Sequence, residues 1–320
     1  MSEGTAEDLP YWHALGALRP FVSALRLREL VARTGSPRTA WETSDEFLQQ
    51  VGWTEEQRTH VRDVRDHFHP DEEYARLTVG GLRIVTQEDE QFPALLREIY
   101  DPPLLLYIRG ELPHDVPCVA IVGSRKATQY GKTATNLLVR PLASRGLTIV
   151  SGLAYGIDAE AHRATLAVHG KTIAVLGSGS DDAALYPRAH RQLAADIVAS
   201  GGAVITEYPP GTRPQGYFFP QRNRIIAGLS RALVVVEADE KSGALITARL
   251  ALDQNREVFA VPGPITSDLS RGTNGLLRDG AAPARSADDI WAALELQDAL
   301  PAAAPSSTHQ QLESIPAGDA

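Results

Sequence analysis

The sequence CVAIVGSRKATQYG, residues 118–131, carries an apolar strand directly into a glycine turn. The turn contains Gly123, Ser124, Arg125 and Lys126. At the carboxyl end of a parallel strand, a turn of this kind points backbone N–H groups at an anion, and the helix that follows adds the positive end of its dipole. The Arg125 guanidinium adds a fork of donors that matches phosphate oxygens. The stretch therefore predicts a phosphate-binding turn within an α/β fold.

Acidic residues are missing from two segments of a chain that is acidic as a whole. The 320 residues carry a formal net charge of -9. No Asp or Glu lies between Val116 and Ile157 or between Tyr208 and Arg231, and both segments contain basic residues: Arg125, Lys126, Lys132, Arg140 and Arg145 in the first, and Arg213, Arg222, Arg224 and Arg231 in the second. If the fold brings the two segments together, they form a confined site for an anionic ligand.

Short apolar runs predict six β-strands, at residues 119–122, 147–150, 172–176, 203–205, 232–236 and 257–261. The connections between these runs are each long enough to hold a helix, which favours parallel pairing. The predicted fold class is therefore a doubly wound, Rossmann-like α/β domain. Before it, apolar positions such as Leu15, Leu18 and Val22 recur near helical spacing and predict a small all-helical module.

Composition argues against a membrane-spanning or disulfide-stabilised protein. The N-terminal MSEGTAEDLP is polar and acidic, and no apolar run approaches the roughly 18 residues of a membrane helix, so we expect a cytoplasmic protein with no membrane partner. Cys118 is the only cysteine, which excludes a disulfide framework and a cysteine-based zinc cluster. Its place at the start of an apolar strand predicts that it packs in the core. We expect no metal and no cofactor.

The common nucleotide-binding motifs fail on spacing. A Walker A loop needs a glycine five residues before Gly-Lys-Thr. That place is taken by Lys126 before Gly131 and by Thr165 before Gly170. The Gly177-Ser178-Gly179 turn lacks the third glycine of the dinucleotide fingerprint. The phosphate-binding turn is therefore not predicted to hold NAD or ATP in the usual way.

Seven ordered motifs carry a family resemblance that covers the chain from Tyr11 to Leu296. They read VAIVGSRKATQYG from residue 119, SGLAYGIDAEAHRATL from 151, KTIAVLGSG from 171, TEYPPG from 206, FPQRNRIIAGLSRALVVVEA from 219, KSGALITARLAL from 241 and VFAVPG from 258. In these motifs the chain resembles the DprA (Smf) family, the DNA processing proteins of bacterial natural transformation. The resemblance implies a protein that binds and protects single-stranded DNA, forms a homodimer and loads the RecA recombinase, with no catalytic residues.

The same resemblance implies a set of DNA-binding residues. It assigns them to the phosphate-binding turn, a Tyr-Pro-Arg element, the Arg-Asn-Arg motif with the phenylalanine before it, and a Lys-Ser-Gly turn: Gly123, Ser124, Arg125, Lys126, Arg188, Phe219, Arg222, Asn223, Arg224, Lys241, Ser242 and Gly243. The three main motifs follow, or lie near, the carboxyl ends of predicted strands, where ligands gather in an open parallel sheet. Phe219 offers a ring on which a base can stack.

Several of these residues also have structural interpretations. Arg224 could pair with Glu207 or Glu237 in the core, and Asn223 could cap the helix that follows it. Ser242 could cap a helix at 244–253, Arg188 could be a solvated loop residue, and at least one of Phe218 and Phe219 is expected in the core. The segment GIDAEAH resembles a catalytic cluster, but Asp158 is better placed to cap a helix than to do chemistry. Pro141 should kink or end the helix that contains it.

The predicted organisation has three parts. Residues 1–75 form a helical, SAM-like module, and the absence of glycine from LRPFVSALRL favours protein contacts there over an independent DNA-binding hairpin. Residues 76–297 form an extended Rossmann-like DNA-binding domain, and the family resemblance implies dimer contacts around 261–277. Residues 298–320 are expected to be a disordered linker and the remnant or truncated start of a winged-helix domain, because QLESIPAGDA is too short to bury a core.

One alternative function belongs to a different class. A related Rossmann-like group hydrolyses nucleotide N-glycosidic bonds with a PGG-x-GT-x-x-E motif. At the corresponding place this chain reads EADEKSGALITARLAL, which lacks the glycine pair, and no glutamate follows Lys241 within it. The chain therefore supplies no acid or base at that position, and a nucleotide-phosphate hydrolase remains the alternative.

Overall fold

The structure, a computed structural model, describes residues 4–113 and 116–294. Six helices form a helical module at the N-terminus: α1 (Gly4–Ala17), α2 (Ala24–Thr34), α3 (Pro37–Glu42), α4 (Asp45–Gln50), α5 (Glu55–Arg65) and α6 (Pro70–Val79). Four of them begin at a Ser or Thr whose hydroxyl accepts a backbone N–H of the first turn, namely Ser23, Ser36, Ser44 and Thr54. These side chains satisfy amides that a helix start leaves unpaired.

A mostly parallel sheet makes up the rest of the fold. Its strands are β1 (Leu82–Thr86), β2 (Leu105–Gly110), β3 (Cys118–Val122), β4 (Thr148–Ser151), β5 (Thr172–Val175), β6 (Ala203–Thr206), β7 (Ala232–Val235), β8 (Glu257–Ala260) and β9 (Ala282–Pro283). The order across the sheet is β1-β2-β6-β5-β4-β3-β7-β8-β9, and among the described strands the antiparallel pairings are those of β2 with β1 and β6. The six predicted strands are confirmed as β3 to β8, and the doubly wound fold class with them.

The strand order reverses at β3. From β3 the chain moves outward through β4, β5 and β6, and then returns to place β7 on the other side of β3. The crossovers leaving the two strands therefore diverge and open a crevice at their carboxyl ends. The glycine turn follows β3 and the Lys-Ser-Gly turn follows β7, so this topology brings both to one place.

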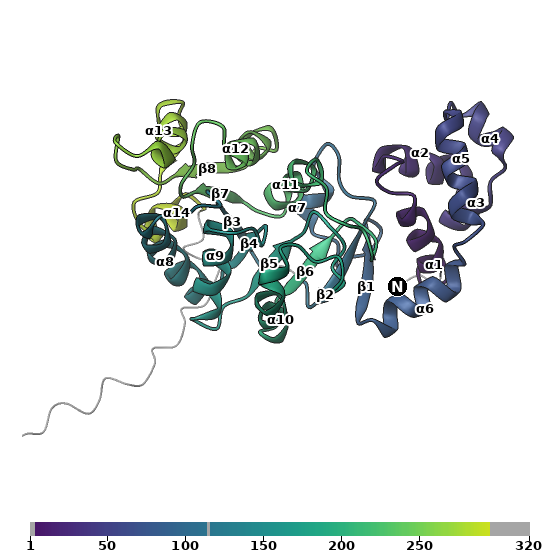
Figure 1. The fold of residues 1–320 in the computed structure, drawn as a ribbon, viewed down its shortest axis with the longest axis horizontal. Helices are drawn as coiled ribbons and strands as arrows, with labels where there is room; N and C mark the ends of the chain where they lie inside the picture. Colours follow the sequence, from purple (N-terminus) through teal and green to yellow (C-terminus); the bar gives the residue numbers. More distant parts are fainter. Residues whose placement is uncertain (1–3, 114–115, 295–320) are drawn as a thin grey trace, which may run out of the picture.

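Helices cover both faces of the sheet (Figure 1). One face carries α8 (Gln129–Ser144), α9 (Ile157–Leu166), α10 (Arg191–Ala199) and α14 (Ala287–Ala293), and the other carries α7 (Ala94–Arg97), α11 (Phe218–Gly228) and α12 (Gly243–Asp253). Helix α13 (Arg271–Arg278) packs near β8. Because both faces are covered, the parallel strands are buried along nearly their whole length, which explains their continuous apolar runs.

The helical module shares an apolar core with the antiparallel edge of the sheet. Leu82 and Ile84 of β1 and Leu105 and Tyr107 of β2 are buried in the same cluster as the apolar residues of the module. The buried His13 Nδ1 lies 2.9 Å from the Tyr107 hydroxyl and adds a polar tie across this contact. The predicted boundary after residue 75 falls inside α6. The predicted linker and winged-helix remnant at 298–320 lie outside the described residues.

The prediction for Cys118 is confirmed, whereas Pro141 does not end its helix. Cys118 is buried as expected, and burial raises the pKa of its thiol to about 12. Helix α8 continues past Pro141 to Ser144, so the proline does not end it. The carbonyl deprived of a partner belongs to Leu137, which lies on the solvent face where water can replace the lost N–H. None of the described helices is long and apolar enough to cross a membrane.

Candidate functional site

A cavity of about 570 Å³, here called the β3–β7 cavity, opens where the strand order reverses. Nine of the twelve predicted site residues line it: Gly123, Ser124, Arg125, Lys126, Phe219, Arg222, Asn223, Ser242 and Gly243. The fold thus brings the two acid-free segments together. Sequence reasoning did not predict the other lining residues, which include Gly216, Ala154, Asp158, Asp239, Ile246 and Thr247. Of these, only Asp239 had a usable sequence signal, since it lies two residues before Lys241.

The turn at Gly123–Lys126, here called the GSRK turn, is fixed by backbone contacts. The Ser124 N–H donates to the Glu237 carbonyl at 2.7 Å, and the Ser124 carbonyl accepts from Ile157 N–H at 3.1 Å. Gly156 has φ +78, and a Cβ there would lie 2.1 Å from the Ser124 carbonyl oxygen. Only glycine allows this approach, so the loop after β4 holds the turn from one side while the end of β7 holds it from the other.

The N-terminus of α8 is occupied from within the protein. The Glu237 carboxylate accepts from Thr128 N–H at 2.9 Å and from the Thr128 hydroxyl, and it packs so closely on Gly131 that a Cβ there would lie 2.2 Å from Oε2. The expectation that the α8 dipole faces a bound phosphate is therefore wrong, because an internal carboxylate already takes that place. The cationic groups of the GSRK turn that an anion could reach are the Arg125 and Lys126 side chains, both exposed.

Arg222 is the cation on the floor of the cavity. The residue is 4% exposed, and its Nε atom has no hydrogen-bond partner among the described residues. Burial lowers the pKa of Arg222 to about 10, although the neighbouring Asp158 carboxylate works in the opposite direction. A guanidinium rarely stays buried with a donor unpaired, because desolvation of a charge is costly. The site therefore holds a positive charge that an entering anion can neutralise.

Asp158 lines the cavity without capping a helix. Helix α9 has Gly156 at its N-cap position with no side-chain cap, so the prediction of a cap at Asp158 is wrong. The buried carboxylate instead accepts from Gly152 N–H at 3.1 Å and from Ala154 N–H at 3.4 Å. Burial raises the pKa of Asp158, and Arg222 partly opposes this effect. Asp158 thus holds the loop after β4 against the floor of the cavity.

Aromatic and helical elements complete the wall. The Arg125 guanidinium lies over the Phe219 ring, with 5.4 Å between its central carbon and the ring centroid. Phe218 is fully buried, so of the two phenylalanines it is the core residue, as predicted. Ser242 caps α12 by accepting from Ala244 N–H at 3.3 Å. The first turn of α12 therefore faces the cavity with the positive end of its dipole.

Arg224 points away from the cavity. Its guanidinium donates to both carboxylate oxygens of the buried Glu207, at 2.7 and 2.8 Å. Of the two possible core partners, Glu207 and Glu237, Arg224 therefore pairs with Glu207. Asn223 lies inside α11 and caps no helix, but it lines the cavity. Arg188 begins a short 3-10 helix and is exposed, and Lys241 is exposed at the turn before α12. Arg188, Arg224 and Lys241 do not line the cavity.

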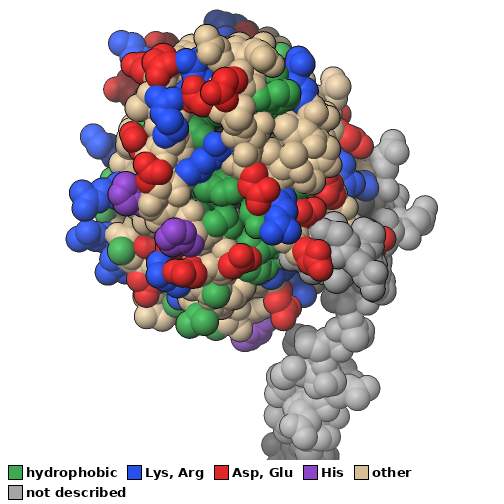
Figure 2. All heavy atoms as spheres, turned by 90° about the vertical axis from the view of Figure 1, so that its right-hand side faces the viewer, with side chains coloured by type: hydrophobic (Ala, Val, Ile, Leu, Met, Phe, Trp, Pro, Cys, Tyr) green, Lys and Arg blue, Asp and Glu red, His purple; other side chains and the backbone are tan. Residues whose placement is uncertain are grey.

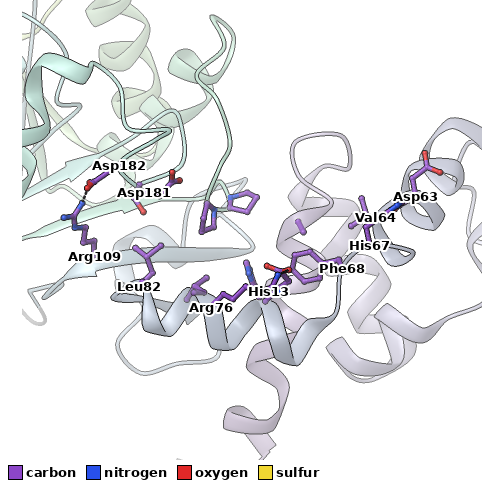
Figure 3. A pocket seen from close by; sticks show the side chains of 17 residues that line it. His13, Asp63, Val64, His67, Phe68, Arg76, Leu82, Arg109, Asp181 and Asp182 are labelled. Carbon is purple, nitrogen blue, oxygen red and sulfur yellow. Dashed lines mark hydrogen bonds and ion pairs between the residues drawn. The ribbon is translucent and has the colours of Figure 1, made fainter.

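A larger cavity, about 740 Å³, lies between the helical module and the sheet. Figure 3 shows His13 and Phe68 on the module side, facing Asp181, Asp182 and Arg109. It contains none of the predicted site residues. On the outer face of the module, basic and acidic side chains are interspersed (Figure 2), so that face does not present a field of one sign.

Comparison with known proteins shows which family the chain belongs to. The family model described as DNA recombination-mediator protein A matches residues 83–295. The chain belongs to this family. Protein Smf of Synechocystis is 39% identical over 290 residues, which cover 89% of this chain and 72% of that protein. The DNA recombination-mediator match begins inside β1 and spans the whole β3–β7 cavity.

Two solved structures share the fold. The X-ray structure of DNA processing protein A (DprA) from Streptococcus pneumoniae has a TM-score of 0.61 and 38% identity, and the match covers 72% of this chain and 84% of that one. DNA processing protein A from Helicobacter pylori, reported with its unique single-stranded DNA binding mode, has a TM-score of 0.58 and 31% identity, over 68% of this chain and 97% of that one. Both matches support placement in the DprA family and a Rossmann-like sheet.

Proposed function

We propose that this protein binds single-stranded DNA through backbone phosphates in the β3–β7 cavity, protects the incoming strand and loads the RecA recombinase on it during natural transformation. Its action is binding, with no catalytic step. Arg125, Lys126 and Arg222 neutralise phosphates inside the cavity, Asn223 and the α12 N-terminus add hydrogen bonds, and Lys241 and Arg188 extend the contact outside it. A binding mode of this kind reads the backbone and little of the base edges.

The buried Arg222 guanidinium carries this proposal. A positive charge that is almost fully removed from water and lacks a partner at Nε destabilises the fold, so a ligand that pairs with it is favoured. The ligand is an anion narrow enough to enter a cavity of about 570 Å³, as a phosphate diester is. The relative from Helicobacter pylori, with its reported single-stranded DNA binding, supports DNA as the source of that phosphate.

Two partners complete the proposal. A homodimer places two cavities on one strand and raises affinity through effective concentration. The segment around 261–277 is proposed as the dimer contact, where Ile265 is 91% exposed. Sedimentation of the full chain tests dimerisation. The rate at which RecA hydrolyses ATP on DNA already coated with single-strand binding protein tests loading, and it should rise when this protein is added.

The deciding experiment is fluorescence anisotropy of a labelled oligo-dT over a salt series. Three or four phosphate contacts predict a slope of log K against log salt of about -2 to -3, since each contact contributes about 0.7 on a single strand. Arg125→Ala should weaken binding and reduce the slope by about 0.7. Arg140→Ala is the matched control, because Arg140 is an exposed arginine on α8 that does not line the cavity.

Three results would overturn the proposal. Binding that does not change with salt would exclude phosphate neutralisation, and equal loss in both variants would move the site away from the GSRK turn. If the wild-type protein binds no DNA at low salt, release of free base from nucleoside monophosphates becomes the next assay. Base release would establish the alternative hydrolase, despite the missing glutamate after Lys241.

A further inference from the structure

Helix α11 presents two opposite faces. Phe219, Arg222, Asn223 and Ile226 fall on one side of the helix and line the β3–β7 cavity. Arg224 follows Arg222 by two positions, which is about 200° around an α-helix, so it projects from the other side. Whatever holds Arg224 therefore sets the rotation of the helix and the direction of the cavity residues.

A buried ion network holds Arg224. The Glu207 carboxylate, 1% exposed, accepts hydrogen bonds from Arg224 on both oxygens, and Arg19 Nη2 donates to it at 2.6 Å. Arg224 Nε donates to the Asp101 carbonyl at 2.9 Å, and Arg28 donates to the neighbouring Pro102 carbonyl. Arg19 and Arg28 belong to the helical module. The module thus reaches α11 through Glu207 and through the loop at 101–102.

Two arginines, Arg19 and Arg224, share the one buried carboxylate of Glu207. Burial alone would raise the pKa of Glu207, but Arg224 and Arg19 hold it below its ordinary value. Arg19 is 9% exposed at its side chain and also lies over the Tyr208 ring, 5.9 Å from its centroid. Loss of either arginine would leave a buried carboxylate with an incomplete set of partners, and the network would have to shift.

We propose that Arg19, Glu207 and Arg224 are positioning residues for the DNA-binding face of α11, and that the helical module thereby sets the affinity of the β3–β7 cavity. The inference rests on the proposed DNA-binding function. It also assigns Arg224 a different role from Arg222, although the two arginines belong to one motif. Arg222 binds the anion, and Arg224 orients the helix that carries Arg222.

Arg19→Ala in the full chain is the test, because it removes the module's contact with Glu207 and leaves Arg224 in place. Oligo-dT affinity should fall about 3- to 10-fold, and a double-mutant cycle with Arg222→Met should show coupling of about 2-fold or more. The salt slope should stay unchanged, because no phosphate contact is lost. Arg19→Lys should restore part of the affinity by returning the charge.

Arg65→Ala is the matched control for general destabilisation. Arg65 is a partly buried arginine of the same module that donates to the Thr43 carbonyl at 2.8 Å, with no described hydrogen bond to α11. It should lower the melting temperature and leave DNA affinity unchanged. Equal weakening by Arg65→Ala and Arg19→Ala would overturn the inference, as would additivity with Arg222→Met. A salt slope about 0.7 shallower in Arg224→Lys would do so as well, because it would mark Arg224 as a phosphate contact.

A second measurement does not depend on DNA. Amide hydrogen exchange in α11 should be faster in Arg19→Ala than in the wild-type protein, while exchange in α8 should not change. Unchanged protection of α11 would overturn the positioning role. If the wild-type protein fails to bind oligo-dT, the proposed function falls, and the exchange measurement still decides whether Arg19 positions the helix.

Discussion

Replacing Arg222 with methionine should stabilise the protein while it weakens DNA binding. Burial holds the pKa of Arg222 at about 10, more than two pH units below its ordinary value. At about 1.4 kcal/mol for each pH unit, the charged side chain costs roughly 3 kcal/mol in this environment. Methionine has a similar length and no charge to desolvate, and Asp158, whose pKa burial already raises, can take up a proton when it loses this neighbouring cation. The free energy of unfolding should therefore rise by about 1 to 3 kcal/mol.

Replacing Arg224, two residues later, with methionine should instead lower the free energy of unfolding. Arg224→Met leaves the Glu207 carboxylate, 1% exposed, with Arg19 as its remaining cation. A buried charge left without any partner typically costs about 3 to 5 kcal/mol, and because Arg19 remains on one oxygen of Glu207 we expect the loss to lie below that range. One helix therefore contains two arginines whose replacement moves stability in opposite directions.

Urea unfolding at neutral pH and oligo-dT anisotropy measure the two effects on each variant. The expected pattern is a more stable, more weakly binding Arg222→Met and a less stable Arg224→Met. The reasoning is refuted if Arg222→Met loses more than about 1 kcal/mol of stability and still binds DNA at wild-type affinity. In that case the guanidinium would be a structural group whose pairing outweighs its desolvation.

Three further outcomes are expected. Burial lowers the pKa of His13 to about 4 and that of His162 to about 3. As the pH falls, these histidines are therefore protonated in the unfolded chain before they are protonated in the folded protein, and urea unfolding should show roughly 3 kcal/mol less stability at pH 5 than at pH 7. Equal stability at both pH values would contradict this. Gly156→Ala should weaken oligo-dT binding by displacing the GSRK turn, whereas Gly211→Ala, at φ +80 with open space around it, should cost only about 1 kcal/mol of strain and leave affinity intact. Glu237→Gln should lower the melting temperature through loss of about 1 kcal/mol at the α8 N-terminus, and an unchanged value would count against that charge contact.

The parallel half of the fold was predictable because its strands are buried on both faces. Such strands read as unbroken apolar runs, and β3 to β8 were found for that reason. The antiparallel strands β1 and β2 were not predicted individually, since Arg83 and Arg109 interrupt their apolar character. The position of the site followed from topology, because turns after β3 and β7 must meet where the strand order reverses.

The roles of single residues were harder to predict. Periodicity indicates that α11 is a helix but not which side faces the cavity, so Arg222 and Arg224 were assigned the same role. The Glu237 contact with Thr128 joins residues 109 positions apart, and no local pattern indicates it. Arg19 and Glu207 are 188 positions apart, so the contribution of the helical module could emerge only from the folded chain.

The shared core of the helical module and the sheet edge bears on how the chain unfolds. The DNA recombination-mediator match starts at residue 83, one residue after β1 begins at Leu82. A fragment cut there would expose Leu104, Leu105 and Tyr107 to water, since these residues are buried in the cluster they share with the module. We therefore expect the intact chain to melt in one cooperative transition and the fragment to aggregate, which makes the helical module a condition for the solubility of its neighbour.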